Sequence, residues 1–141
     1  MLSTPCRFFS AFLLVTSAWS LGTSAKAQDV RAALGRVEEA FQQGNGRNLL
    51  AGAADRLEIA VLEAPSFYSR AQAMYVMENF FRTYPPKQFD IQDADPSEES
   101  LYAPGLYWST SQSEPFRVYV RLRRMAQQWE LREIRIEQRD P

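Results

Sequence analysis

The sequence predicts an α+β fold, and three observations carry that prediction. Two helical runs, 29–43 and 46–54, follow an apolar N-terminal segment. A longer helical run, 69–84, has a start signal, a helical period and a stop signal that agree with one another. The rest of the chain consists mainly of strand-like runs, which are 56–62, 87–93, 101–110, 116–124 and 128–138.

The first 27 residues are predicted to form a secretory signal peptide. Arg7 provides the positive start, residues 8–21 form a mostly apolar core, and Ala25-Lys26-Ala27 is a small-x-small cleavage site. Because the apolar run is shorter than the ~20 residues of a membrane-spanning helix and contains several Ser and Thr residues, we expect no membrane span. The protein is thus expected to reach the periplasm or the extracellular space after cleavage near Ala27, with residues 28–141 forming a single domain.

Residues 29–62 are predicted to form two helices and a strand. The first helix, 29–43, carries apolar residues at helical spacing: Val30, Leu34, Val37 and Phe41. Gly44 is suited to the left-handed conformation that ends a helix. A second, short helix is expected over 46–54, and the alternation of apolar and polar residues over 56–62 is typical of a strand.

Residues 69–84 form the best-defined predicted helix. Ser69 is suited to be its N-cap, and the Gln72 side chain can bond back to the Ser69 amide, which together make a capping box. Pro85 and Pro86 prevent the helix from continuing. One side of the helix is apolar and largely aromatic: Ala73, Met77, Phe80, Phe81 and Tyr84. We expect this stripe to be core, and a stripe that lines a ligand pocket is the alternative.

A short strand, 87–93, and a polar loop, 95–100, are predicted after the second proline. The next strand-like run, 101–110, contains Pro104, which has no N–H to donate to a sheet. We therefore expect that strand to begin after Pro104 or to kink there.

The last two strand-like runs are predicted to form a hairpin with a β-bulge at Arg132-Glu133. With Arg124 opposite Trp129, a continuous register would bury Glu133 beside Val120, and one extra residue removes that fault. The expected pairs beyond the bulge are Val120 with Ile134, Val118 with Ile136, Arg121 with Glu133 and Arg117 with Glu137. The outward arginines are then neutralised by the neighbouring strand, which makes a polyanion site the less favoured interpretation.

Several ordered segments resemble one family of secreted proteins. They are Phe41-Gln42-Gln43-Gly44-Asn45, Tyr68-Ser69-Arg70-Ala71-Gln72-Ala73, Phe80-Phe81, Pro85-Pro86, Phe116-Arg117-Val118-Tyr119-Val120 and Leu131-Arg132-Glu133-Ile134-Arg135-Ile136-Glu137. These segments are similar to the uncharacterised family called domain of unknown function 4783. The resemblance implies a nuclear transport factor 2-like or cystatin-like fold, in which helices pack into the concave side of a curved, mostly antiparallel sheet. It also implies a bacterial envelope or secreted protein, and it implies no known activity.

The composition excludes several kinds of chemistry. The chain has no histidine, and its only cysteine, Cys6, lies in the predicted leader. Zinc sites, triads with a histidine base and thiol redox chemistry are therefore excluded, and we expect no metal and no cofactor. The formal net charge of −1 becomes −3 when Arg7 and Lys26 leave with the leader, so no nucleic-acid partner is expected.

The favoured functional hypothesis is a non-catalytic module that binds a small apolar ligand or a protein partner in the bacterial envelope. The groups that could enter a ligand pocket are Tyr75, Asp90, Tyr107 and Trp108. The alternative is an acid/base enzyme, similar to an isomerase, that uses a pocket carboxylate and a tyrosine. That alternative requires Asp90, Glu58 or Glu130 to lie in an enclosed pocket within hydrogen-bond reach of a tyrosine hydroxyl. The ligand, the partner and the oligomeric state are left open.

Overall fold

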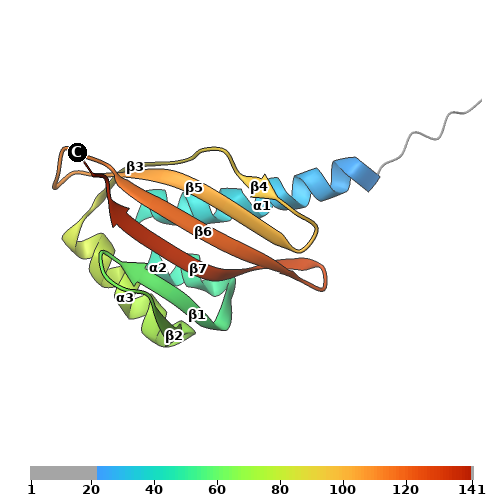
Figure 1. Cartoon of the computed structure of the whole chain (residues 1–141), viewed down its shortest axis with the longest axis horizontal. Helices are drawn as coiled ribbons and strands as arrows, with labels where there is room; N and C mark the ends of the chain where they lie inside the picture. Colours follow the sequence, from blue (N-terminus) through green and yellow to red (C-terminus); the bar gives the residue numbers. More distant parts are fainter. Residues whose placement is uncertain (1–21, 141) are drawn as a thin grey trace, which may run out of the picture.

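A computed structural model describes residues 22–140, in which three helices pack against one face of a curved seven-stranded sheet (Figure 1). The helices are α1 (Gly22–Gln43), α2 (Gly46–Ala51) and α3 (Arg70–Thr83). The strands are β1 (Ala53–Val61), β2 (Ser66–Ser69), β3 (Pro86–Ile91), β4 (Asp95–Pro96), β5 (Ser100–Ser109), β6 (Phe116–Met125) and β7 (Gln128–Gln138). The predicted α+β arrangement, with helices on a curved and mostly antiparallel sheet, is confirmed.

The sheet has the strand order β2-β1-β7-β6-β5-β3, and β4 pairs with β5 beyond the end of β3. Neighbouring strands are antiparallel except β1 and β7, which are parallel. A parallel pair requires a long crossover, and here the whole chain from β2 to β6 lies between the two partners. The sheet is therefore mixed, with the β1–β2 hairpin added beside the C-terminal strand.

Helix α1 starts at Gly22, earlier than the predicted residue 29, and ends at the predicted Gln43. Gly44 follows with a φ of 62°, the left-handed conformation expected of a glycine that stops a helix. A Cβ at this position would lie only 3.0 Å from the Pro86 ring. Residues 22–27 of the predicted leader belong to α1, and residues 1–21 lie outside the described part of the chain.

The boundary between α2 and β1 differs from the prediction. Helix α2 ends at Ala51 instead of residue 54, and β1 begins at Ala53 instead of residue 56. The cause is tertiary, because the Leu131 N–H donates to the Gly52 carbonyl over 3.0 Å and Ala53 pairs with Leu131. Pairing with β7 therefore overrides the helical preference of the alanines.

The structure contains two short strands for which the sequence predicted none: β2, directly ahead of α3, and β4, at the start of the predicted loop 95–100. The strand start expected after Pro104 is wrong, since β5 begins at Ser100, runs through Pro104 and pairs it with Tyr119. The Pro104 carbonyl accepts a hydrogen bond from the Gln92 N–H over 2.8 Å. In an antiparallel strand the N–H and the carbonyl of one residue point the same way, so the backbone nitrogen of Pro104 also faces the segment between β3 and β4. Regular pairing is interrupted in that segment, so the lack of an N–H donor is tolerated.

Helix α3 has the predicted capping box. The Ser69 hydroxyl accepts a hydrogen bond from the Gln72 N–H over 3.2 Å, and the Gln72 Oε1 accepts one from the Ser69 N–H over 3.1 Å. Tyr84 is the C-cap, directly ahead of the two prolines. The predicted stripe is core: Ala73, Met77, Phe80 and Phe81 are buried, and Tyr84 is half-buried.

The predicted bulge in the β6–β7 hairpin is confirmed. Leu122 pairs with Leu131, whereas the next pair is Arg121 with Glu133, so Arg132 is the extra residue. The pairs predicted beyond the bulge are all present, and the isoleucines of β7 are buried.

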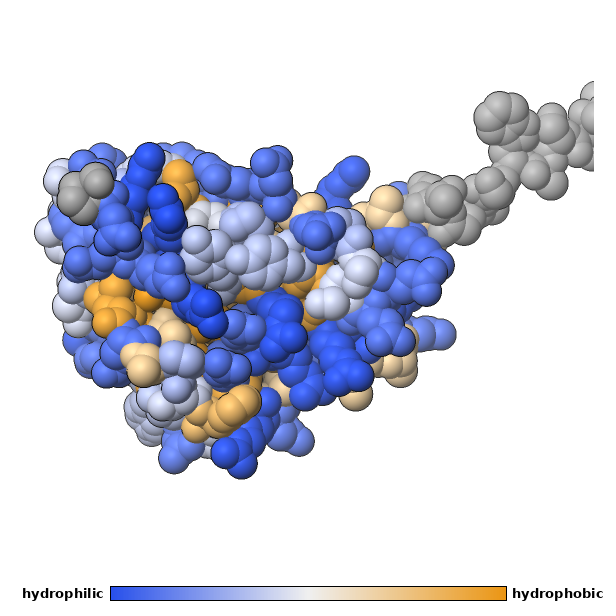
Figure 2. All heavy atoms as spheres, viewed as in Figure 1, coloured by the Kyte–Doolittle hydropathy of each residue, from blue (hydrophilic) through white to orange (hydrophobic). Residues whose placement is uncertain are grey.

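The outer face of the sheet is rich in charge, as the blue residues over β6 and β7 show in Figure 2. Arg121 Nε lies 3.0 Å from Glu133 Oε2, and Arg132 Nη2 lies 2.9 Å from Glu130 Oε2. Partly exposed ion pairs contribute at most about 1 kcal/mol each. The Arg121–Glu133 pair joins β6 to β7 and helps to match the two strands in register, whereas Arg132 and Glu130 both belong to β7.

The core lies between the inner face of the sheet and the helices. The Phe41 and Phe89 ring centroids are 4.5 Å apart, and those of Phe80 and Tyr107 are 5.3 Å apart. These buried rings attach α1 to β3 and α3 to β5. Within residues 22–140, no helix has the length and apolar character needed to cross a membrane.

Candidate functional site

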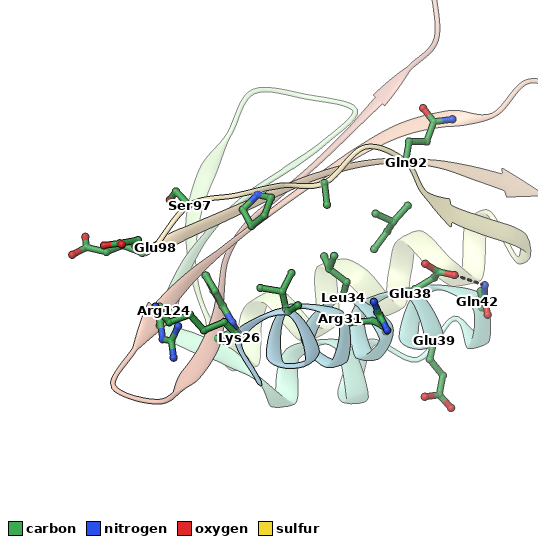
Figure 3. Close-up of a pocket in the computed structure, with 18 residues that line it drawn as sticks. Lys26, Arg31, Leu34, Glu38, Glu39, Gln42, Gln92, Ser97, Glu98 and Arg124 are labelled. Carbon is green, nitrogen blue, oxygen red and sulfur yellow. Dashed lines mark hydrogen bonds between the residues drawn. The ribbon is translucent and has the colours of Figure 1, made fainter. Parts of the chain in front are cut away.

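A groove of about 1210 Å³ lies between α1 and the chain that leads from the end of β3 to the start of β5 (Figure 3). One wall is the N-terminal part of α1, which extends beyond the sheet in Figure 1. The other wall is formed by residues 91–99. Arg124 and Trp129, near the tip of the β6–β7 hairpin, close one end.

The groove forms where no regular strand covers α1. Near its C-terminus the helix is held by the Phe41 and Phe89 stack and by a hydrogen bond from Gln42 Nε2 to the Phe89 carbonyl of 3.0 Å. Strand β3 ends at Ile91, and residues 92–94 leave the sheet before β4 begins. The contact between α1 and β3 is therefore confined to the C-terminal part of the helix.

Apolar side chains line the middle of the groove. They are Val30, Leu34, Ile91, Ala94, Pro96 and Trp129. Figure 3 shows Leu34 rising from α1 toward the strands. Gly35 also lines the groove, and no atom lies within 4 Å of the position that a Cβ would occupy there. Val30, Leu34, Ile91 and Ala94 are half-buried, Pro96 is exposed and Trp129 is buried. A ligand with an apolar body would remove the accessible part of these surfaces from water.

Polar groups mark the two ends of the groove. At one end, Gln42 Nε2 donates to Glu38 Oε1 over 3.4 Å, as the dashed line in Figure 3 marks. At the other end, the Arg124 Cζ lies 5.9 Å from the centre of the Trp129 ring, within the range of a cation–π contact. Glu38 thus stands at one end and Arg124 at the other, and Glu98 and Glu99 also line the groove on the Arg124 side.

Further charged residues border the groove. Lys26 and Arg31 come from α1, and Glu39 and Glu98 come from the two walls. In Figure 3, the side chains of Glu39 and Glu98 point away from the groove. Lys26 would leave with the predicted leader, whereas Arg124 would remain.

None of the four sequence-predicted pocket residues lines this groove. Tyr75 is 72% exposed on α3, and Tyr107 is fully buried on the inner face of the sheet. Trp108 points to the outer face because successive strand residues alternate. Asp90 shares that outer face through the pairing of β3 with β5, and its carboxylate accepts a hydrogen bond from Gln88. The structure thus brings Asp90 and Trp108 to one face and separates them from Tyr75 and Tyr107.

The Tyr107 hydroxyl is occupied within the core. It donates a hydrogen bond of 2.5 Å to the Tyr84 carbonyl. Burial raises the pKa of the Tyr107 hydroxyl above its ordinary value of 10.0, because the phenolate would lose its hydration. This tyrosine therefore holds the end of α3 against β5 and offers no group to the groove.

The carboxylates that the enzyme alternative requires are placed elsewhere. Asp90 is on the outer face, Glu58 lies beside Glu133 where β1 meets β7, and Glu130 is paired with Arg132. Among residues 22–140, none of these three carboxylates has a hydrogen bond with a tyrosine. The carboxylate–tyrosine pair is thus not formed by them.

Sequence reasoning missed the residues that build the groove. One signal was present, because Arg124 takes the inward-facing position that continues an apolar row of β6, which is Phe116, Val118, Val120 and Leu122. An inward cation at the end of such a row indicates a site where the core opens. Leu34 carried no comparable signal, since it matches an ordinary core stripe.

A protein-family model described as "Domain of unknown function (DUF4783)" matches residues 34–137. The match includes α2, α3 and all the strands up to the last residue of β7. No protein of curated function matches the sequence.

Three solved structures illustrate the fold. A DUF4783 family protein from Bacteroides ovatus is 22% identical with a TM-score of 0.70, and the alignment covers 75% of this chain and 94% of that one. An NTF2-like protein of unknown function from Shewanella baltica is 12% identical with a TM-score of 0.65, covering 84% and 97%. A protein of unknown function with a cystatin-like fold from Nostoc punctiforme is 13% identical with a TM-score of 0.64, covering 84% and 93%. These similarities confirm the predicted fold.

Proposed function

The chain belongs to the DUF4783 family, and from that premise we propose that it is an exported, non-catalytic module that binds a small, mainly apolar ligand. The binding site is the groove between α1 and the segment that follows β3. The family carries no assigned activity, so the proposal is supported by the groove itself. The observation that carries it is the set of apolar side chains, most of them half-buried, that line one open space.

The dimensions of the groove support a small ligand. Ligand pockets have volumes of about 300–1,000 Å³, and this groove of about 1210 Å³, whose lining includes Lys26 and Ala27 of the predicted leader, lies just above that range. From Val30 to Glu38, α1 rises by about 12 Å at 1.5 Å per residue. An apolar body of that length would contact Leu34 from one wall and Ile91 from the other.

The polar groups of the groove favour binding over acid/base catalysis. Glu38 is held by Gln42, and the groove residues include no tyrosine. An envelope protein that inserts an apolar segment would use the same surface. The experiments below separate a small ligand from such a partner.

Gly35 offers a direct test. Phenylalanine there should fill the groove without a steric clash, and it replaces a helical glycine, so the G35F variant is expected to stay folded. Binding of phenylnaphthylamine, a neutral apolar fluorescent probe, is measured by titration. We expect saturable binding to the unmodified protein and a loss of at least about tenfold in affinity for G35F. The control is A32F, which places the same side chain on an exposed position of α1 that does not line the groove.

Native mass spectrometry of protein purified from its own envelope identifies what is bound. A retained small molecule supports the proposal, and a retained protein supports the envelope-partner alternative. Probe binding that is absent, or that is equal in the unmodified protein and G35F, would contradict a ligand site in this groove.

A further inference from the structure

We propose that the ligand of this groove carries an anionic head group, of the carboxylate type, which binds Arg124 at the end of the groove formed by Trp129. The inference rests on the proposed function, because it names the chemical class of the ligand for the same site. The ligand would then be amphipathic, with an apolar tail along α1 and one anionic end.

The position of Arg124 in β6 is the first observation. Residues of this strand alternate between the faces of the sheet, and Arg124 is in phase with Val120 and Leu122, which are buried on the inner face. Its neighbour Arg123 is exposed on the outer face. Arg124 is half-buried, so its guanidinium has lost part of its hydration. Such a cation is stabilised when an anion pairs with it.

The second observation is the set of contacts that Arg124 makes. The ion pairs among residues 22–140 engage Arg70, Arg121, Arg132 and Arg135, so Arg124 is one of several arginines without an ion pair. Its backbone N–H bonds the Glu99 carbonyl over 2.8 Å, which fixes the strand but leaves the guanidinium available. The Trp129 ring holds the guanidinium by its face. Donors in the plane of the guanidinium remain able to bind a carboxylate in a bidentate manner.

The third observation is where the charges lie along the groove. Glu38 lies at the end opposite Arg124, as Figure 3 shows. Glu98 and Glu99 line the groove on the Arg124 side, and Figure 3 shows the Glu98 side chain pointing away from the groove. A carboxylate ligand would be repelled by Glu38, whereas at the Trp129 end it can pair with the inward-facing Arg124. Val30 and Leu34 provide apolar surface between the two ends. The groove therefore favours one orientation, with the anionic head at Arg124 and the tail toward Ile91.

The test compares three probes with the same apolar chain, which are decanoate, decanol and decylammonium. Isothermal titration calorimetry is performed on protein that is expressed from the full-length sequence and purified after the cell has processed it. A charge-assisted hydrogen bond is worth a factor of ten or more, so decanoate is expected to bind at least about tenfold more tightly than decanol. Decylammonium is expected to bind more weakly than decanol.

Two neighbouring arginines provide the matched variants. R124Q should reduce the affinity for decanoate to that for decanol and leave the decanol affinity unchanged. R123Q removes the same charge from the outer face and should keep the full preference for decanoate. Thermal unfolding of both variants confirms that they are folded.

The outcomes separate this inference from the proposed function. If decanol and decanoate bind equally, or if R124Q keeps the preference, the anionic head group is contradicted while the apolar groove remains supported. If the preference is lost equally in R123Q, general surface charge explains it and the role of Arg124 is overturned. If no probe binds, the proposed function fails together with the inference.

Discussion

Tyr107 shows how one side chain connects a helix end to the sheet. It is fully buried, and its hydroxyl donates to the carbonyl of Tyr84, the C-cap of α3. The Tyr84 N–H in turn donates to the Phe80 carbonyl over 2.8 Å. The buried Tyr107 hydroxyl thus finds a hydrogen-bond acceptor inside an aromatic cluster. The Tyr84 carbonyl, which has no partner within the helix because it lies at the helix end, gains a donor.

The stability of the protein is predicted to fall at alkaline pH through Tyr107. Burial raises the pKa of this hydroxyl in the folded state, so its contribution is complete below pH 10.0 and is lost as the pH rises toward the folded pKa. Y107F should cost about 1 kcal/mol near neutral pH, because the hydrogen bond to Tyr84 is removed. Above about pH 10 the difference between Y107F and the unmodified protein should shrink.

Thermal midpoints from about pH 8 to about pH 12 measure this difference. The control is Y75F, which changes the same residue type at a position that is 72% exposed, and its pH profile should match that of the unmodified protein. If the difference in thermal midpoint between Y107F and the unmodified protein stayed constant across the pH series, ionisation of Tyr107 would not be a cause of the loss of stability at alkaline pH.

Phe80 is predicted to be a main contributor to the core. It is 3% exposed, and its ring centroid lies 5.4 Å from that of Tyr84 and 5.5 Å from that of Phe116. F80A should lower the free energy of unfolding by about 3–5 kcal/mol, measured by chemical denaturation. Y75A, on the exposed side of the same helix, should change it by less than about 0.5 kcal/mol. An F80A variant as stable as Y75A would assign the stripe to a pocket or an interface.

At the scale of elements, the β6–β7 hairpin depends on one inserted residue. Arg132 lies between two stretches of regular pairing, and its insertion lets Leu131 and Ile134 face the same side of the sheet. A shift by one residue would reverse the faces of every following side chain. The apolar positions of β7 change phase at Arg132, and the extra residue of the bulge keeps them on the buried face of the sheet.

Two single-residue deletions test this account. Deleting Arg132 removes the bulge and keeps every other pair of the ladder, so the loss of stability should be small. Deleting Arg135, beyond the bulge, turns Ile136 away from the core or slips the strand, and should cost on the order of 2–5 kcal/mol. Denaturation curves of the two variants provide the comparison. Equal losses would mean that register is not set by the bulge.

At the scale of the whole molecule, the predicted leader and the groove share a helix. Helix α1 begins at Gly22, and both Lys26 and Ala27 line the groove. The predicted cleavage after Ala27 would shorten α1 and open the end of the groove beside Arg124. Export and the shape of the binding site are thus connected in the proposed function.

We predict that the exported protein begins at Gln28. The reason is the tripartite leader with its small-x-small site, and the measurement is N-terminal sequencing together with the intact mass of the exported form. A Lys26→Ala change leaves the small residues of the site in place and should be processed at the same position. Exported protein that still begins with Met1 would contradict the prediction.

Local signals allowed the sequence by itself to determine the end of α1, the ends of α3 and the hairpin register. The capping box of Ser69 and Gln72, the stop at Gly44 and the bulge at Arg132 each depend on residues close in the chain or directly opposite in a hairpin. Their energies follow from local backbone geometry and from the two-residue period of a strand, so the pattern alone carries the information.

Only the tertiary structure decided what depends on contacts between distant segments. Pairing with β7 makes Ala53 part of strand β1 and not of helix α2. Pro104 is tolerated inside β5 because regular pairing is interrupted between β3 and β4. The groove likewise exists because β3 ends where α1 continues, so that Leu34 of the helix and Arg124 of a hairpin line the same space. Sequence periodicity separates a buried face from an exposed one. It does not show which apolar face is left without a packing element over part of its length, because that depends on how far two packed elements extend along each other.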